Sequence, residues 1–235
     1  ITPWNFPLHQ IIGKVAPAIA AGCTMVLKPS REAPINAFIL ADMLHEIGLP
    51  DGVFNLVSGR GSTVGSRLSS HPDVDMISFT GSTSAGIAVT EDAAKTVKRV
   101  TLELGGKSAN VVLEDADVIR AAKSSISACF ANSGQTCSAL TRLIVPESKI
   151  SEMIPVIVER VSKYKLGSPM DPSTRCGPMV SASQKESVLE YIRAGITEGA
   201  TLVAGGPEDV EGIEKGHFVR PVSYTHLTLP TNDLV

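Results

Sequence analysis

The chain alternates short runs of apolar, often β-branched residues with longer stretches in which apolar residues recur at helical spacing. Short apolar runs predict buried strands, and the longer periodic stretches predict helices that cover a sheet. In the first part of the chain the pattern predicts strands at residues 24–28, 53–57, 75–79 and 99–104, and helices at residues 8–21, 34–47, 62–70 and 82–96. Strands that alternate with helices are typical of βαβ units around a parallel sheet.

Two adjacent glycines, Gly105 and Gly106, follow the last of these strands, and the pattern then starts again. The second part is predicted to contain strands at residues 109–113 and 140–145 and helices at residues 117–131, 150–165 and 183–197. Residues 223–235 are rich in threonine and leucine and continue none of these patterns. We therefore expect an α/β protein with two domains that divide at the glycine pair.

Composition and charge narrow the classes of partner. Hydrophobic residues make up 43% of the chain and charged residues 19%, which predicts a globular protein with a sizeable core. The 21 basic and 24 acidic side chains are scattered, so charge indicates neither a nucleic-acid nor a membrane partner and favours a small-molecule substrate. The longest apolar stretch, residues 15–27, is interrupted by Pro17 and Gly22 and is shorter than the roughly 20 residues that span a bilayer.

The four cysteines have neither the density of a disulfide scaffold nor the paired spacing of a zinc site. We therefore expect a reducing compartment, the cytoplasm, and no metal. Cys137 is the candidate nucleophile, because it lies in a polar, glycine-containing loop at residues 130–137, where a thiolate can be exposed near backbone N–H groups. Taken alone, a loop cysteine also fits an ordinary structural role. Cys23 and Cys129 are expected in the core, and Cys176 in a surface turn.

Glu103 is a candidate general base, because it lies among apolar residues at a strand end, just before the glycine pair. Apolar surroundings suit a carboxylate to proton transfer near neutral pH. An equally good interpretation of this segment is a glutamate that points to solvent from a half-exposed strand.

Two further segments suggest phosphate binding. Residues 78–83 place hydroxyl groups at a strand-to-helix junction, where a helix N-terminus binds anions, although serine and threonine also cap most helices. Residues 59–65 contain Gly59, Gly61 and Gly65 and loosely match a dinucleotide fingerprint, with one extra residue before the third glycine.

Together these segments resemble the aldehyde dehydrogenase superfamily. Residues 4–7, 28–30, 79–83, 103–107 and the Cys137 loop match the family in order and with near-family spacing, and the resemblance runs from Ile1 to about Pro221. It implies a Rossmann-like parallel-sheet cofactor domain at residues 1–105, part of an α/β catalytic domain at residues 106–222, and a tail at residues 223–235 that does not match. We expect a fragment with little activity of its own, from a parent that is a homodimer or homotetramer.

The resemblance also implies an activity, namely oxidation of an aldehyde to a carboxylic acid with NAD or NADP through a cysteine thiohemiacetal and thioester. Cys137 would be the nucleophile, Asn5 with the Cys137 backbone N–H would stabilise the oxyanion, and Glu103 would activate the hydrolytic water. The cofactor-binding residues that it implies are Trp4, Lys28, Ser30, Arg31, Gly61, Gly65, Phe79, Gly81, Ser82 and Leu104.

The sequence departs from the family pattern at Arg31, where a glutamate is usual, so the choice between NAD and NADP stays open. The Glu-x-Phe-Gly-Pro segment that grips the nicotinamide ribose in the family is absent from this chain, and the substrate cannot be identified. One alternative is a CoA-acylating semialdehyde dehydrogenase, against which Glu103 argues. The other is a catalytically silent family member or fragment, against which, for the parent, the presence of Asn5, Glu103 and Cys137 argues.

Overall fold

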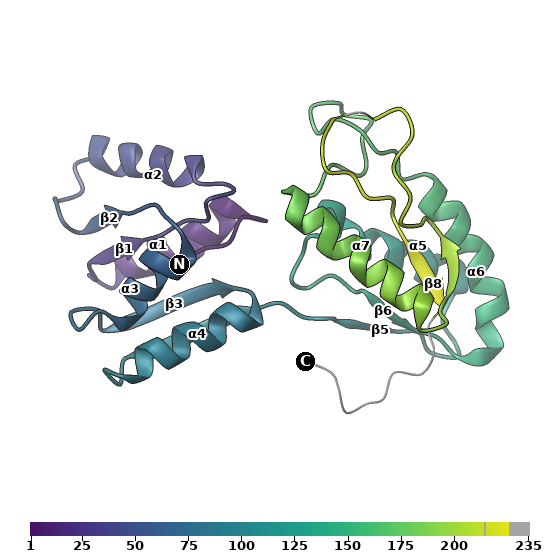
Figure 1. The fold of residues 1–235 in the computed structure, drawn as a ribbon, viewed down its shortest axis with the longest axis horizontal. Coiled ribbons are helices and arrows are strands. Elements are labelled where there is room, and N and C mark those ends of the chain that lie inside the picture. Colours follow the sequence, from purple (N-terminus) through teal and green to yellow (C-terminus); the bar gives the residue numbers. More distant parts are fainter. Residues whose placement is uncertain (214, 226–235) are drawn as a thin grey trace. The chain divides into compact units, whose positions relative to one another are not determined.

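The computed structural model describes residues 1–213 and 215–225, shown as a ribbon in Figure 1. The chain divides into two compact units, Ile1–Gly105 (unit 1) and Gly106–Val235 (unit 2). The division falls at the glycine pair that the sequence analysis used as a boundary. Both units mix helices with strands, so the predicted α/β class is confirmed.

Unit 1 contains each helix and strand that the pattern predicted, with ends that shift by a few residues. The elements are α1 (Pro7–Ala20), β1 (Met25–Leu27), α2 (Ile35–Glu46), β2 (Phe54–Leu56), a π-helical turn (Gly61–Gly65), α3 (Ser66–Ser70), β3 (Met76–Gly81), α4 (Thr83–Ala94) and β4 (Arg99–Leu104). Strand β1 pairs with β2, and β3 pairs with β4, both in parallel.

Residues 1–2 join these two strand pairs. The Ile1 nitrogen donates to the Ser78 carbonyl at 2.9 Å, and the Thr80 N–H donates to the Ile1 carbonyl at 3.1 Å. The Thr2 N–H donates to the Lys28 carbonyl at 3.1 Å. Bonds to residues on either side of one partner are the pattern of parallel pairing. The order is therefore β2, β1, residues 1–2, β3 and β4, with the carboxyl ends at one edge.

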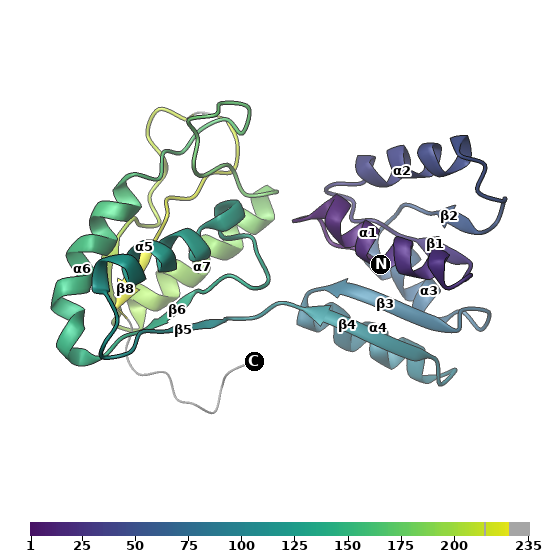
Figure 2. The same cartoon turned by 180° about the vertical axis from the view of Figure 1, so that it is seen from behind.

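Helices cover both faces of this sheet, as the alternation of side chains along β3 shows. Ile77 and Phe79 are buried in one apolar cluster with Val89 of α4, and Figure 2 shows α4 running along β3 and β4. Ser78 points the other way, where it accepts a hydrogen bond at 3.0 Å from the Lys14 Nζ of α1. Such two-sided cover is typical of doubly wound α/β folds.

Unit 2 contains β5 (Ala109–Val111), α5 (Val118–Cys129), a 3₁₀ turn (Ala131–Gly134), β6 (Arg142–Ile144), α6 (Glu147–Ser162), α7 (Ala182–Thr197), β7 (Thr201–Ala204) and β8 (Ser223–Thr225). Strands β5 and β6 pair in parallel, and β7 and β8 pair antiparallel. The sequence analysis did not predict β7 or β8. It saw no pattern in residues 223–235, of which 223–225 form β8 and 226–235 lie outside the described residues.

The larger core of unit 2 lies between α5 and α6, where apolar side chains recur at helical spacing on the facing sides. Its buried members are Val112, Val118, Ala122, Ile126, Met153, Ile157 and Val161. A smaller cluster surrounds α7, with Met179, Leu189, Ile192 and Val219. Among the described residues of the chain, the helices are all too short or too polar to cross a membrane.

Candidate active site

The carboxyl edge of the unit 1 sheet gathers the segments that follow its strands. In open α/β sheets, ligands bind outside this edge, because loops and helix N-termini converge there. The segments that the structure brings to it are residues 3–5 after residues 1–2, residues 28–31 after β1, residues 57–65 after β2, residues 81–82 at the end of β3 and residues 103–105 at the end of β4. All the predicted site residues of unit 1 lie in these segments, except Phe79, which lies within β3.

Lys28 is the most enclosed charged residue of this edge. Its side chain is only 4% exposed, and its Nζ donates to the Pro29 carbonyl at 2.7 Å. Burial lowers the pKa of Lys28, and the neighbouring charge of Arg31 lowers it further. A Cβ added at Gly65 would lie 3.8 Å from the Lys28 Cε, so the π-helical turn packs against the lysine stem. Among the described residues Lys28 has no ion-pair partner, so packing and the bond to the Pro29 carbonyl position it.

Ser30 and Arg31 continue the turn after β1. The Ser30 Oγ accepts a hydrogen bond from the Glu32 N–H at 3.2 Å. The exposed Arg31 lies with its Nη2 3.9 Å from the Glu32 Oε1, a long ion pair between half-exposed side chains. Such a pair contributes little, so Arg31 can leave it for another anion.

The N-terminus of α4 stands at the same edge and is capped by Ser82, whose Oγ accepts from the Ala85 N–H at 3.3 Å. The aligned peptide dipoles of such a terminus favour phosphate. Gly81 has a packing reason to be glycine, because a Cβ there would lie 2.5 Å from the Phe79 ring. Leu104 packs in the same way on Gly86, where a Cβ would lie 2.7 Å from its Cδ2.

Two buried threonine hydroxyl groups at this edge indicate whether a polar ligand fits there. Thr2 is 3% exposed and Thr80 is 8% exposed. Within residues 1–213 and 215–225, neither Oγ1 has a hydrogen-bond partner. A buried polar atom without a partner is costly, and a bound polar group can relieve that cost. Together with Lys28 and the α4 N-terminus, these hydroxyls fit a phosphate-bearing dinucleotide.

Glu103 lies on β4 opposite Thr80, and its side chain is exposed. The apolar enclosure that the sequence analysis considered is therefore wrong for the described chain, and the solvent-facing alternative holds. The charged neighbour of Glu103 is Lys14 of α1. Burial lowers the pKa of Lys14, and the negative charge of Glu103 opposes that shift. The sequence analysis missed Lys14, because a single lysine on a helix belongs to no motif.

In unit 2 the structure places Cys137 in an exposed turn, as a nucleophile requires. The Ala139 N–H donates to the Thr136 carbonyl at 3.1 Å and closes this turn. The residues before it are left-handed, with φ of 51° at Asn132, 57° at Ser133 and 78° at Gly134. Asn5 and Glu103 belong to unit 1, and Cys137 belongs to unit 2.

Two side chains of the Cys137 loop bind a distant segment. The Ser133 hydroxyl accepts a hydrogen bond from the Gly177 N–H at 2.9 Å and donates to the Gly177 carbonyl at 3.2 Å. The Gln135 Oε1 accepts from the Val180 N–H at 3.0 Å. The sequence analysis assigned no role to either residue. Both are polar residues in the loop at residues 130–137 that carries Cys137, and this feature could have indicated a role for them.

The other cysteines differ from expectation. Cys23 is exposed, not part of the core, because it follows a left-handed turn at Gly22 between α1 and β1. Cys176 is 3% exposed rather than at the surface, because it forms a parallel bridge with Leu166, and burial raises the pKa of its thiol. Burial also raises the pKa of the half-buried Cys129.

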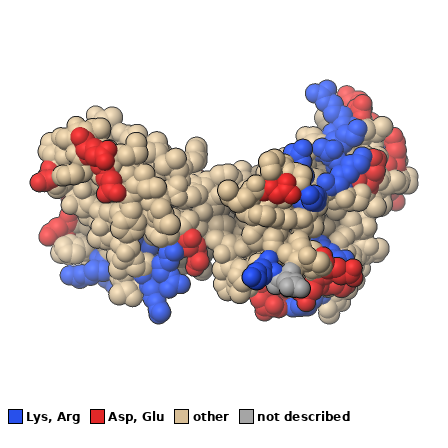
Figure 3. All heavy atoms as spheres, turned by 90° about the horizontal axis from the view of Figure 1, so that it is seen from above, with Lys and Arg blue, Asp and Glu red and all other residues tan. Residues whose placement is uncertain are grey.

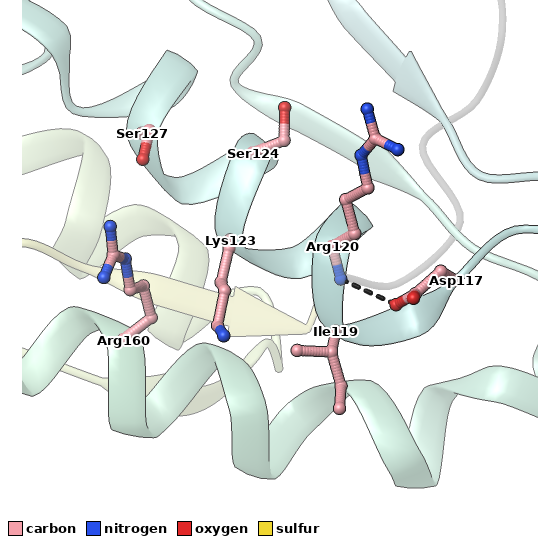
Figure 4. A pocket seen from close by; sticks show the side chains of 7 residues that line it. All are labelled: Asp117, Ile119, Arg120, Lys123, Ser124, Ser127 and Arg160. Atoms are coloured by element: carbon pink, nitrogen blue, oxygen red, sulfur yellow. Dashed lines mark hydrogen bonds between the residues drawn. The ribbon is translucent and has the colours of Figure 1, made fainter.

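An open hollow of about 540 Å³ lies on α5 and α6, and its lining contains none of the predicted site residues (Figure 4). Its lining is Asp117, Ile119, Arg120, Lys123, Ser124, Ser127 and Arg160. The Asp117 carboxylate accepts from the Arg120 N–H at 2.9 Å and so serves as a helix cap. The side chains of Arg120 and Lys123 extend in opposite directions. Because its charges do not converge, we assign this hollow no ligand.

Comparison with known proteins decides the family. The family model described as "Aldehyde dehydrogenase family" matches residues 1–230. The chain belongs to the aldehyde dehydrogenase family. Among curated aldehyde dehydrogenase relatives, it is 51% identical over 225 residues to a 3-succinoylsemialdehyde-pyridine dehydrogenase of Pseudomonas sp, covering 96% of this chain and 47% of that protein. It is 47% identical to a putative aldehyde dehydrogenase of Staphylococcus epidermidis, covering 100% of this chain and 50% of that protein.

Solved aldehyde dehydrogenase structures have the same fold. Aldehyde dehydrogenase C of Pseudomonas syringae, in a mutant complex with NAD⁺ and octanal, superposes with a TM-score of 0.94 at 49% identity, over 97% of this chain and 47% of that one. An aldehyde dehydrogenase of Bartonella henselae gives a TM-score of 0.92 at 48% identity, over 95% and 47%. The α/β class with a Rossmann-like fold that the resemblance implied is confirmed. The chain spans about half the length of these relatives.

Proposed function

We propose that the whole protein oxidises an aldehyde to a carboxylic acid with NAD or NADP, through a thioester on Cys137. The observation that carries the proposal is the exposed Cys137 turn in a chain of this family. The complex of the Pseudomonas syringae relative with NAD⁺ and octanal supports both the cofactor and the substrate class.

In the proposed reaction, the Cys137 thiolate attacks the aldehyde carbon and forms a thiohemiacetal. The Asn5 side-chain amide and the Cys137 backbone N–H donate to the oxyanion, and each such donor contributes about 3 kcal/mol in comparable sites. The thiohemiacetal carbon loses a hydride, for which a bound nicotinamide would be the acceptor, and this leaves the thioester on Cys137. Glu103 then takes a proton from water, whose oxygen attacks the thioester carbon and releases the acid and the Cys137 thiolate.

For the cofactor, we propose that the adenosine ribose lies by the turn after β1 and the pyrophosphate by the N-terminus of α4. The buried Lys28 and the cap at Ser82 support this placement. The residues that we assign to cofactor binding are Trp4, Lys28, Ser30, Arg31, Gly61, Gly65, Phe79, Gly81, Ser82 and Leu104. Of these, the contacts of Phe79, Gly81 and Leu104 indicate that they act by shaping the edge rather than by donating hydrogen bonds.

We also propose a cytoplasmic protein that acts on a small molecule as a homodimer or homotetramer. All four cysteines are free thiols, which suits a reducing compartment. Both signs of charge occur in each unit on the face drawn in Figure 3, which suits a small substrate better than a polyanion.

Two substitutions in the full-length enzyme test the proposed chemistry. Cys137→Ala should abolish turnover, because no other group can form the thioester. Glu103→Gln should leave a rapid burst of reduced cofactor followed by slow turnover, because only deacylation needs the base. Stopped-flow absorbance of reduced cofactor measures both. A Glu103→Gln enzyme with the wild-type steady-state rate and no burst would refute the assignment of the base.

A further inference from the structure

The loop that carries Cys137 is fastened at two points to residues 177–180. At the first point, the Ser133 hydroxyl bonds both the N–H and the carbonyl of Gly177. At the second, the Gln135 amide accepts from the Val180 N–H at 3.0 Å and donates from its Nε2 to the Pro178 carbonyl at 3.4 Å. Both side chains therefore use a donor and an acceptor on the same stretch of backbone.

The segment at residues 176–180 is a firm support for the loop. Cys176 and Met179 are 3% and 5% exposed, and Met179 belongs to the apolar cluster around α7. The Met179 N–H donates to the His217 carbonyl at 2.8 Å, and the Cys176 N–H donates to the Lys165 carbonyl at 3.1 Å. Burial and bonds to two other parts of unit 2 thus hold the segment in place.

The backbone of the loop needs such a support. Asn132 and Ser133 adopt left-handed conformations, with φ of 51° and 57°, which residues with a Cβ rarely adopt. Conformations of this kind persist only where the surrounding structure enforces them, and they cluster at functional sites. Ser133 lies within this left-handed stretch and Gln135 follows it, so their bonds to residues 177–180 are contacts that enforce the conformation.

We infer that Ser133 and Gln135 are positioning residues that aim the Cys137 nucleophile. Gln135 is two residues from Cys137, and the turn closed by Thr136 and Ala139, which contains Cys137, begins directly after Gln135. A movement of the fastened backbone therefore displaces the sulfur. A misplacement of about 1 Å between reacting groups can cost on the order of a hundredfold in rate. The inference rests on the proposed function of Cys137.

The test is the pre-steady-state burst of reduced cofactor in the full-length enzyme. Gln135→Ala and Ser133→Ala should each lower the burst rate constant by about tenfold or more. Gln135→Glu keeps an acceptor for the Val180 N–H but loses the Nε2 donor to the Pro178 and Asn132 carbonyls. Its burst rate constant should therefore lie between those of the alanine variant and wild type. The dissociation constant for NAD should change by less than about twofold, because the proposed cofactor residues lie in unit 1.

The matched control is Ser162→Ala, which removes a hydroxyl that bonds the Glu159 carbonyl within α6 and should leave the burst unchanged. A purely structural role for Ser133 and Gln135 would lower the melting temperature but leave the folded enzyme with a normal burst. Burst rates within about twofold of wild type in Ser133→Ala and Gln135→Glu would overturn the inference, even if Gln135→Ala does not fold. A wild-type burst that survives in Cys137→Ala would instead overturn the proposed function.

Discussion

Arg31 follows Lys28 by three residues in the turn after β1, and its partner there is Glu32 at a distance of 3.9 Å. A guanidinium binds phosphate through two parallel hydrogen bonds, which is stronger than a long, exposed ion pair. Arg31 can therefore exchange Glu32 for the 2′-phosphate of NADP, with Lys28 as a second positive charge. The competing outcome is that Arg31 keeps its ion pair with Glu32, so that the enzyme continues to prefer NAD.

We predict that the full-length enzyme accepts NADP with little penalty, and that Arg31→Glu shifts the preference toward NAD. A carboxylate at this position would repel the 2′-phosphate in a partly desolvated site. The measurement is the ratio of kcat/KM for the two cofactors in both enzymes. The prediction fails if wild type favours NAD by more than about a hundredfold, roughly 2.7 kcal/mol, and the substitution does not widen the gap.

Val97 is a second residue whose local conformation predicts a measurable effect. It is 92% exposed and has a φ of 54°, a left-handed conformation that strongly disfavours a β-branched side chain. Val97→Gly should stabilise the chain by about 1 kcal/mol, because it removes this strain and loses no buried surface. Thermal unfolding measures the change. Val97→Ala serves as a control of intermediate effect, and a lower melting temperature for the glycine variant would contradict the prediction.

At the scale of the element, helix α4 combines a cap with a proposed phosphate site at Ser82. Ser82→Ala should destabilise the chain by about 1 kcal/mol, because the Ala85 N–H loses its acceptor. Ser82→Asp should keep the cap and the melting temperature but weaken NAD binding by about tenfold, because its carboxylate would repel the pyrophosphate. Thermal unfolding and fluorescence titration with NAD separate the two effects. Equal NAD affinity in wild type and Ser82→Asp would place the pyrophosphate elsewhere.

The elements show how far the sequence could be interpreted. Long helices such as α1 and α6 were predicted, because many residues share one period. Strands β7 and β8 were missed, because the register Thr201↔Thr225 pairs two segments of three or four residues that have no period of their own. In the candidate site, Cys137 and Glu103 were proposed from short motifs. Lys14 and the Ser133–Gly177 contact were not, because they depend on residues that only the fold brings together.

At the scale of the whole chain, each unit has apolar clusters of its own. Ile11 of α1 is 0% exposed in unit 1, and Ile157 of α6 is 7% exposed in unit 2. We predict that heat unfolds the chain in more than one cooperative step, with a calorimetric enthalpy above the van't Hoff value. Ile11→Ala and Ile157→Ala, each costing about 2–5 kcal/mol, should lower different transitions. A single transition that both substitutions shift equally would contradict this prediction.

The hydrogen bonds between Ser133 and Gly177 span 44 positions of the sequence, and this separation bears on how the protein is made. A ribosome adds roughly 5–20 residues per second, so Cys137 emerges several seconds before the backbone that restrains its loop. During that interval the growing chain carries an accessible Cys137 thiol whose loop is not yet held by residues 177–180. A chain stalled before Gly177 would expose this cysteine to oxidants while lacking an ordered nucleophile. Reactivity toward aldehydes should therefore begin only after Val180 has left the ribosome and folded.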